Sequence, residues 1–571
     1  MSQEFGYEKK ADSAELKQEN GVYEADSFVP EGTLHRQLKN RHIAMISIGG
    51  VIGTGLFLGT GGALQQGGPV GLLLGYGTIT YAVMVSLGEM ISYLPIPGGH
   101  IKLADRFVDP ALSFTMGWNY WYNWTIILPA ELSAAATLVS YWTHNDINPA
   151  VWISICWVVV VTINMLGAGA YGECEFIFAS IKVITITGLI ILGIVIDLGG
   201  GPNHDRLGFR FWKHPGPFTQ FNGIGGSEGR FLGWWAVMTQ AAFSYIGTEI
   251  VAIAAGEAKN PRKNIPKAIK RVYIRILLFY ILGTFVIGLL VASNDPALSL
   301  GHGTAAASPF VIAIRNAGIK GLPSVINAAL ITSAWSAASS DVFTSSRAIY
   351  GLALTGAAPR IFTRTSKSGL PYVAVIFCSL FAGLAYMSVS SGSNKVFGWF
   401  VNLTSIAGLM TWFGISVTYI RFHAACKAQG LDRRTLPFYS RLQPYAAWYA
   451  AISTVVVCFF SGFSVFLKDS WDTATFVTNY LSFILFFVLY IAAKLWFRKP
   501  IIPAAEVDLH SGIAEIEAST YDDPPPRNGL EKFWAWLGNE MLVSLVEKRV
   551  FSVEKFDFKM SRPLISSLIW G

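Results

Sequence analysis

Two glycine-bearing apolar stretches contain the residues whose type and spacing could bind a small charged molecule. The first runs from Ile48 to Gly62 and holds seven glycines. The second runs from Phe243 to Glu249, and both stretches contain the tripeptide Ile-Gly-Thr, at 52–54 and 246–248. A glycine inside a helix costs about 1 kcal/mol relative to alanine. We therefore predict that both helices unwind at these points, pack very closely against a neighbour, or do both.

A broken helix leaves backbone groups without partners on either side of the break. Free N–H groups at the start of a helix attract a carboxylate, whereas free carbonyl oxygens accept hydrogen bonds from an ammonium group. Two breaks at corresponding positions in two halves of a chain therefore predict a site for a zwitterion. The alternative is that these glycines are small-residue packing positions between helices. The shared motif in two stretches favours the breaks.

Three of the ionisable residues inside apolar runs are candidates for function, because a charge costs about 2.5–3.5 kcal/mol at mid-membrane. Glu131 follows Leu128-Pro129 and could carry a proton, contact a substrate or cap a backbone donor freed by the proline. Glu249 comes directly after the second break and could couple protons to gating or hold the broken segment in place. Lys182 could take part in coupling, or its chain could extend to the inner surface. All three are candidate proton-coupling residues.

Other polar residues favour structural roles. Glu89, near the end of the second apolar run, predicts a salt bridge with a basic loop. His100 and His423 lie near expected helix ends and predict surface positions. The five cysteines form no CxxC pair, which argues against a disulfide framework or a zinc site. The aromatic group Trp118, Tyr120, Trp121, Tyr122 and Trp124 is more typical of interfacial packing than of a substrate cage.

The composition indicates that membrane helices position these residues. Of the 571 residues, 52% are apolar and only 14% are charged, against about 25% charged in soluble domains. A membrane-spanning helix needs about 20 mainly apolar residues. About twelve runs meet this need, at 43–63, 70–94, 111–141, 149–168, 174–197, 233–256, 272–293, 322–355, 372–391, 397–420, 444–466 and 474–497. We predict an all-α polytopic membrane protein.

The order of the runs predicts a repeat, and the loop charges predict its orientation. Five runs lie between 43 and 197 and five between 233 and 420, which predicts a five-plus-five inverted repeat with two added helices. The loops 257–271 and 421–443 are rich in Lys and Arg, so the positive-inside rule places them and both termini in the cytoplasm. The basic residues form no single patch, which argues against nucleic-acid binding.

Several segments match motifs of a known family. They are Leu34-His35-Arg36 with Arg41-His42, Ile48–Gly62, Pro97-Gly98-Gly99, Leu128–Leu132, Phe243–Glu249, Gly256–Arg262 and Ser345-Ser346-Arg347. In these the sequence resembles the fungal yeast amino acid transporter family of the amino acid–polyamine–organocation superfamily. It looks closest to the proline and neutral amino acid permeases. One departure is Ala338-Ser339-Ser340-Asp341, which replaces a common Asn-Ser pattern.

The resemblance implies a leucine-transporter-like fold and proton-coupled amino acid uptake by alternating access at the plasma membrane. It implies that the amides of Gly53, Thr54 and Gly55 bind the substrate carboxylate. Carbonyls near Phe243 and Ile246 would bind the ammonium group, and the Phe243 ring would cover the site. Trp412 falls where the family places side-chain selectivity, and Lys182 stands where sodium-driven relatives bind an ion.

We divide the chain into a cytoplasmic tail (1–40), a transporter domain (41–498) and a second cytoplasmic tail (499–571). The expected partners are an amino acid, protons and membrane lipids, with ubiquitination machinery acting on lysines of the first tail; no cofactor or metal is expected. The chain contains no HExxH or Walker motif, so an enzyme is not expected. An amino-acid-sensing receptor and a carrier without proton coupling stay open as alternatives.

Overall fold

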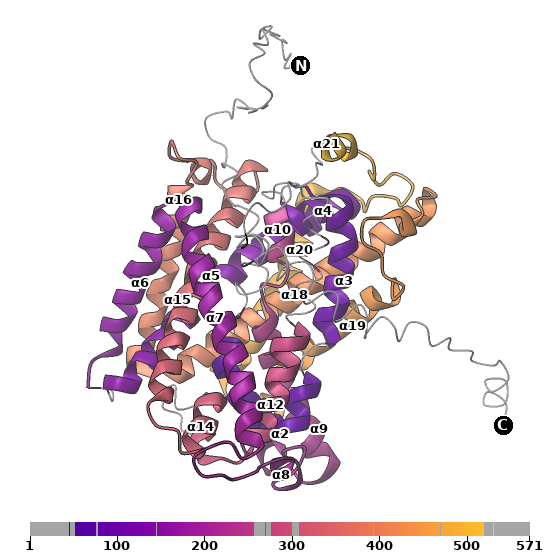
Figure 1. Cartoon of the computed structure of the whole chain (residues 1–571). Helices are drawn as coiled ribbons and strands as arrows, with labels where there is room; N and C mark the ends of the chain where they lie inside the picture. Colours follow the sequence, from indigo (N-terminus) through magenta and orange to yellow (C-terminus); the bar gives the residue numbers. More distant parts are fainter. Residues whose placement is uncertain are drawn as a thin grey trace, which may run out of the picture.

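The computed structural model describes residues 52–75, 78–96, 98–143, 146–255, 276–299, 308–391, 393–468 and 470–518, with Met45, Pro266, Ile269 and Gly529 as isolated residues. Within these ranges the chain forms helices and irregular connections and no strand. Figure 1 shows the long helices packed side by side. The predicted all-helical architecture is thus confirmed for the described part of the chain.

The first two apolar runs meet at a sharp turn. The first run forms η1 (Gly55–Gly59) and the start of α2 (Thr60–Gly75); apart from Met45, its residues before Ile52 lie outside the described ranges. Gly68 has a φ of 73° and a ψ of 177°, so α2 consists of two helices joined at this residue. Pro69 then starts the second run, which continues into α3 (Thr78–Tyr93), because proline suits the first turn of a helix.

The next helices overlap the predicted runs, except the one at Gly99–Phe107, which lies between the runs 70–94 and 111–141. They are α4 (Gly99–Phe107), α5 (Pro110–Thr143), α6 (Pro149–Met165), α7 (Ala168–Asp197), α9 (Gly226–Tyr245) and α10 (Ile250–Ala255). Side-chain caps fix some starts: the Asp109 carboxylate accepts a hydrogen bond from the Leu112 N–H, and Asn148 accepts one from Ala150. Between α7 and α9, a folded loop contains α8 (Arg210–Lys213) and η2 (Phe221–Gly223).

The rest of the chain continues the same pattern. Its elements are η3 (Ile276–Ile281), α12 (Leu282–Leu290), α13 (Pro296–Ser299), α14 (Pro309–Asn316), α15 (Leu322–Leu354), η5 (Arg360–Thr363), α16 (Tyr372–Leu380), η6 (Phe381–Tyr386), α17 (Met387–Ser391), α18 (Ser393–Ala428), η7 (Arg433–Thr435), α19 (Tyr445–Phe460), η8 (Phe463–Phe466), α20 (Thr473–Phe497) and α21 (Ile513–Ala518). Five stretches of the described residues are long and apolar enough to cross a membrane.

The distribution of polarity is that of a membrane protein. Large apolar side chains are exposed along α6, α7, α19 and α20, including Val158, Ile184, Ile452 and Leu495. Several charged side chains are instead buried between the helices, namely Glu89, Glu131, Glu175, Lys182, Glu249 and Asp341. Exposed apolar surface of this extent suits contact with lipid rather than water. Short elements lie at both ends of the bundle, with α8 and α14 at one end and α4 and α21 at the other (Figure 1).

The segment that follows α20 packs against the same end as α4. The Ile502 N–H donates to the Val108 carbonyl at 2.9 Å, and Arg106 donates to the Ser511 carbonyl at 2.8 Å. Val507 and Leu509 are buried. Gln429 at the end of α18 donates to the Val507 carbonyl at 2.7 Å. The beginning of the predicted second tail is therefore bound to the helices, through backbone hydrogen bonds and a small apolar contact.

Candidate functional site

The first break begins at Ile52 and Gly53, which are not helical, and helical structure starts at Thr54. The free carbonyl of Ile52 accepts a hydrogen bond from the Ser333 hydroxyl of α15 at 3.3 Å. The following turns are π-helical from Gly55 to Gly59, with wider backbone hydrogen bonding than an α-helix. Ile52 and Gly53 thus agree with the predicted interruption, whose other side, before Ile52, lies outside the described residues.

The second break lies between α9 and α10. Ile246 leaves the helix with a ψ of 137°, and Gly247 has a φ of 93°, which glycine adopts readily because it has no Cβ. The Thr248 N–H donates to the Tyr245 carbonyl at 3.2 Å, so residues 246–249 form turns rather than a helix. The predicted break at the second tripeptide therefore occurs, with α9 and α10 on either side of it.

The two interrupted helices meet at Gly55. A methyl group placed on Gly55 would lie 2.8 Å from the Ser244 Cα and 3.0 Å from the Phe243 ring. The absence of a side chain at Gly55 thus permits the two helices to approach each other at the breaks. Both interpretations of the glycines, unwinding and close packing, apply to this pair of helices.

Glu131 joins the first break to the interior of the bundle. It lies in the middle of α5, and its Oε1 accepts a hydrogen bond from the Thr54 hydroxyl at 2.8 Å. Its Oε2 is buried and has no hydrogen-bond partner among the described residues. The carboxyl group thus points toward the first tripeptide, and it contacts the Thr54 side chain rather than the backbone.

Glu249 and Trp412 hold the second break. The Glu249 carboxylate accepts hydrogen bonds from the Gly247 N–H and from the Trp412 indole of α18, each at 3.2 Å. Trp412 is 2% exposed, and its N–H is thus engaged with the break. The alternative in which Glu249 ties down the broken segment is seen directly in this geometry. A role for Glu249 in proton coupling stays a prediction.

Phe243 lies in an aromatic and aliphatic cluster beside the second break. Its neighbours include Tyr120 and Trp124 of α5, together with Ile246. The Phe243 ring also meets Phe397 edge to face, with the ring centroids 5.9 Å apart. The predicted aromatic group therefore divides into three parts, because Trp118 and Trp121 pack against a cluster of α15 and α16 residues, and Tyr122 packs against a further cluster.

Lys182 is buried, and it faces three carboxyl groups. It is 1% exposed on α7, so its side chain does not extend to the surface. Electrostatic interactions connect it to Glu175 of the same helix, Glu131 of α5 and Asp341 of α15. Glu175 and Asp341 were not predicted to be charged members of a site. The spacing of Glu175 and Lys182 by seven residues was a usable signal, since it places both on one helix face.

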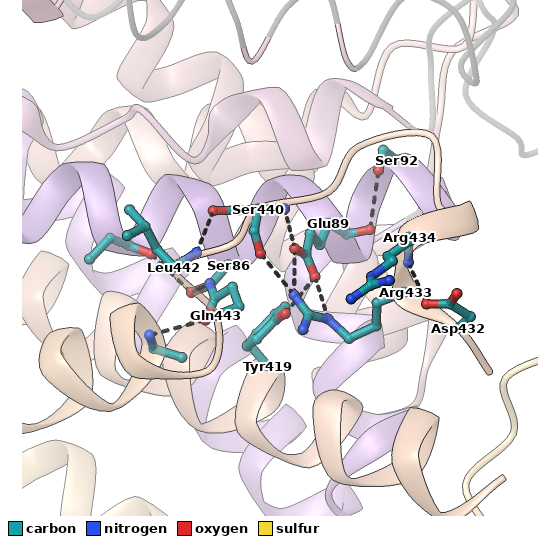
Figure 2. A network of polar contacts seen from close by, with 12 residues as sticks. Ser86, Glu89, Ser92, Tyr419, Asp432, Arg433, Arg434, Ser440, Leu442 and Gln443 are labelled. Carbon is teal, nitrogen blue, oxygen red and sulfur yellow. Dashed lines mark hydrogen bonds and ion pairs between the residues drawn. The ribbon is translucent and has the colours of Figure 1, made fainter. Parts of the chain in front are cut away.

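Glu89 forms the predicted salt bridge at the end that carries α4. Its carboxylate is 2.8 Å from Nη2 of Arg433, and the Ser440 N–H donates to it at 2.7 Å (Figure 2). The Tyr419 hydroxyl of α18 donates to the other oxygen at 2.5 Å. These contacts fasten the loop between α18 and α19 to α3. The structural interpretation of Glu89 is confirmed.

The prediction for His100 is wrong. The residue lies in the first turn of α4, but it is fully buried and its ring packs edge to face against Tyr120. Burial lowers the pKa of His100 to about 3. The position near a helix end suggested exposure, whereas α4 turns this face toward α5. His423 is partly exposed, in agreement with its predicted position.

No cofactor site was expected, and among the described residues no group of three or more His, Cys, Asp or Glu is arranged to hold a metal ion. All five cysteines are free thiols. An all-helical membrane bundle, in which the helix that starts at Thr54 lies against a helix broken at 246–249, is typical of one class, the polytopic membrane transporters. Residues 42–502 match the amino acid permease family, so the chain belongs to that family.

Characterised relatives in fungi agree with this assignment. The chain is 45% identical to the dicarboxylic amino acid permease of Saccharomyces cerevisiae over 85% of its own length and 82% of the relative's. It is 43% identical to the proline-specific permease of Emericella nidulans, over 88% and 93% of the two chains. It is 42% identical to the lysine-specific permease of Saccharomyces cerevisiae, over 90% and 84%. These relatives are permeases, which confirms the prediction that the chain is not an enzyme.

Proposed function

We propose that this protein imports amino acids by proton symport, with alternating access of one central site to the two sides of the membrane. The observation that carries the proposal is the contact of the two helix breaks at Gly55 and Ser244, with Glu131 bound to Thr54. Backbone groups released by such breaks suit the two charged ends of an amino acid. The glutamate beside them supplies a group that can gain and lose a proton.

Each break has a proposed task. Amides of Gly53, Thr54 and Gly55 bind the carboxylate of the substrate, and carbonyls near Phe243 and Ile246 bind its ammonium group. The Phe243 ring covers the site, and Trp412 shapes the space for the substrate side chain. Glu131, Lys182 and Glu249 couple proton binding to transport. The burial of Glu131, Lys182 and Glu249 supports this assignment, because buried charges in membrane helices are costly and mark functional sites.

The finer architecture and the location belong to the same proposal. We assign twelve spanning helices, ten of them in a five-plus-five inverted repeat, with the domain limits at residues 40 and 498. The plasma membrane is the proposed location, with both termini in the cytoplasm and ubiquitination of the first tail, which lies outside the described residues. The basic loops 257–271 and 421–443 support this orientation.

The substrate is proposed to be proline or another neutral amino acid. Its support is the resemblance to proline permeases and the 43% identity to a relative of that name. The relatives' names also include dicarboxylic and basic amino acids, so a panel must contain all three charge classes. A sensing receptor would bind the same substrates without net uptake, and an uncoupled carrier would transport them independently of the proton gradient.

Uptake of radiolabelled amino acids in a permease-deficient yeast strain tests this function. Accumulation that a protonophore abolishes is expected; binding without uptake would indicate a receptor, and uptake unaffected by the protonophore would indicate an uncoupled carrier. The site itself is tested by Gly55→Ala, whose methyl group would meet the Ser244 backbone at 2.8 Å. Gly59→Ala is the matched control, because a methyl group there has no neighbour within 4 Å among the described residues.

Overpacking of this kind typically costs about 1–3 kcal/mol. We therefore expect Gly55→Ala to reduce uptake at least tenfold at equal surface expression, while Gly59→Ala retains it. Equal uptake by the two variants would remove the proposed role of the contact between the breaks.

A further inference from the structure

A buried polar cluster lies between α7 and α15, next to Glu131 of α5. It contains Glu175 and Lys182 of α7 and Asp341 of α15, which are each at most 2% exposed. The sequence prediction of the proton-coupling residues includes Lys182 but neither carboxyl group. Two buried carboxyl groups besides Glu131 therefore lie near Lys182, and neither has a role in the predicted site.

The two helices present these groups to each other. On α7, Tyr171, Glu175 and Lys182 are spaced by four and seven residues, which places them on one face. On α15, Ser336 donates to Glu175 Oε2 at 2.6 Å, and the Ser340 hydroxyl pairs with the Tyr171 hydroxyl at 3.0 Å. The hydroxyl groups of α15 therefore bind the polar face of α7.

Asp341 has a different environment from Glu175. One oxygen of Glu175 accepts a hydrogen bond from Ser336, which stabilises its carboxylate form, although its Oε1 is buried without a partner among the described residues. Asp341 has a buried oxygen of the same kind, Oδ2, but no hydroxyl donor from the described residues. Asp341 also interacts electrostatically with both Glu131 and Glu175, which repel a negative charge on it. Lys182 attracts all three carboxylates. Asp341 is thus the carboxyl group with the least support for its ionised form.

The other charged and titratable groups around α15 do not balance this charge. Arg347 lies further along α15, with its guanidinium carbon 3.7 Å from the centre of the Phe343 ring, and it interacts electrostatically with Tyr171. From α6 and α16, the titratable groups that face α15 are the thiols of Cys156 and Cys378. Three carboxylates and one ammonium group would leave a net charge of −2, and an unbalanced buried charge is strongly unfavourable.

We propose that Asp341 is a proton-binding residue of the transport cycle, held between Lys182 and the carboxylates of Glu131 and Glu175. A proton from the outer solution forms an O–H bond at the Asp341 carboxylate and later leaves to water on the inner side. Each bound proton brings the cluster one charge closer to neutrality. This inference rests on the proposed symport, and it names the group that carries the proton.

Asp341→Asn tests the proposal, because it keeps the shape of the side chain and removes the proton site. The purified full chain, reconstituted in liposomes, is assayed for two processes with the amino acid that the unmodified protein accumulates. Exchange of labelled for unlabelled substrate requires no net proton movement, and we expect it to stay within about threefold. Concentrative uptake driven by a proton gradient should fall at least tenfold and lose its pH dependence. Gradient-driven uptake equal to that of the unmodified protein would overturn the proposal.

Glu175→Gln supplies an independent measurement. Removal of this neighbouring negative charge weakens proton binding at Asp341, so the midpoint of the pH profile should move to lower pH. An unshifted midpoint, or a shift to higher pH, contradicts the proposal even where Asp341→Asn does not fold. Asp205→Asn, in an exposed ion pair with Arg210 on the loop before α9, is the matched control and should leave both processes unchanged. Failure of the proposed function would look different, because the unmodified protein itself would show no proton-driven uptake.

Discussion

Two ion pairs at the end of the bundle that carries α4 are nearly equal in length but differ in burial. The Lys102–Asp105 pair has a separation of 2.6 Å, with side chains 49% and 29% exposed. The Arg433–Glu89 pair has a separation of 2.8 Å, with Arg433 13% exposed and Glu89 fully buried. Exposed pairs are worth at most about 1 kcal/mol. Breaking a buried pair by removing one partner costs about 3–5 kcal/mol.

Glu89→Gln should therefore undock the loop between α18 and α19. Asp105→Asn should have a much smaller effect on stability, because its ion pair is exposed. The glutamine keeps the size of the side chain, but it removes the charge that faces Arg433. It also loses part of the acceptor capacity used by the Ser440 N–H and the Tyr419 hydroxyl. Because Arg433 keeps some contact with solvent, we take the lower limit, about 3 kcal/mol. This corresponds to roughly a hundredfold change in the population of the undocked loop.

Trypsin digestion of the purified full chain measures this change, since trypsin cuts after Arg434 once the loop leaves its docked conformation. Cleavage follows the population of the open form when opening is fast relative to cutting. We expect roughly a hundredfold faster cleavage in Glu89→Gln and less than about fivefold in Asp105→Asn. In the double variant Glu89→Gln/Arg433→Gln, the combined effect should be smaller than the sum of the single effects. Equal cleavage of Glu89→Gln and Asp105→Asn would refute the argument from burial.

Two further predictions concern named contacts. Burial lowers the pKa of His100 to about 3. Between about pH 6.5 and 3, the unfolded chain therefore binds a proton at His100 that the folded chain does not bind. The folded state consequently loses stability as the pH falls through this range. In thermal unfolding, His100→Phe should therefore lose less stability between about pH 7 and 4 than the unmodified protein; equal losses would contradict this. Thr54→Val removes the hydroxyl that donates to Glu131, a bond to a charged group worth about 1.5–3 kcal/mol. Uptake kinetics should show at least a tenfold loss that Thr54→Ser restores, whereas full uptake by Thr54→Val would exclude a role for this bond.

The helices and their breaks could be predicted from the sequence because both depend on local composition. The apolar runs 322–355 and 474–497 correspond to Leu322–Leu354 and Thr473–Phe497. The second Ile-Gly-Thr tripeptide falls between α9 and α10, and in the first tripeptide Ile52 and Gly53 are not helical. A run of apolar residues must be helical in a membrane to pair its backbone groups, and clustered glycine removes the helical preference at one point.

The partners of buried charges could not be predicted in the same way. The spacing of Glu175 and Lys182 gives a shared face of α7, but it does not show that Ser336 and Asp341 of α15 lie opposite. His100 shows the same limit, because a nine-residue helix between two apolar runs can turn either face toward the bundle. Contacts between helices depend on how each is rotated, and composition does not fix this rotation. Glu89 was an exception, since its position near a basic loop left few candidate partners.

Glu131 connects the first helix break with the buried cluster around Lys182 and Asp341. Its Oε1 binds Thr54 at the first break, and its charge acts on both Lys182 and Asp341. A proton gained or lost at Asp341 changes the field at Glu131, and through it the strength of the bond to Thr54. Thr54 directly precedes η1, and Gly55, the first residue of η1, lies against Ser244. In the proposed cycle, one carboxyl group thus links protonation between α7 and α15 to the binding site.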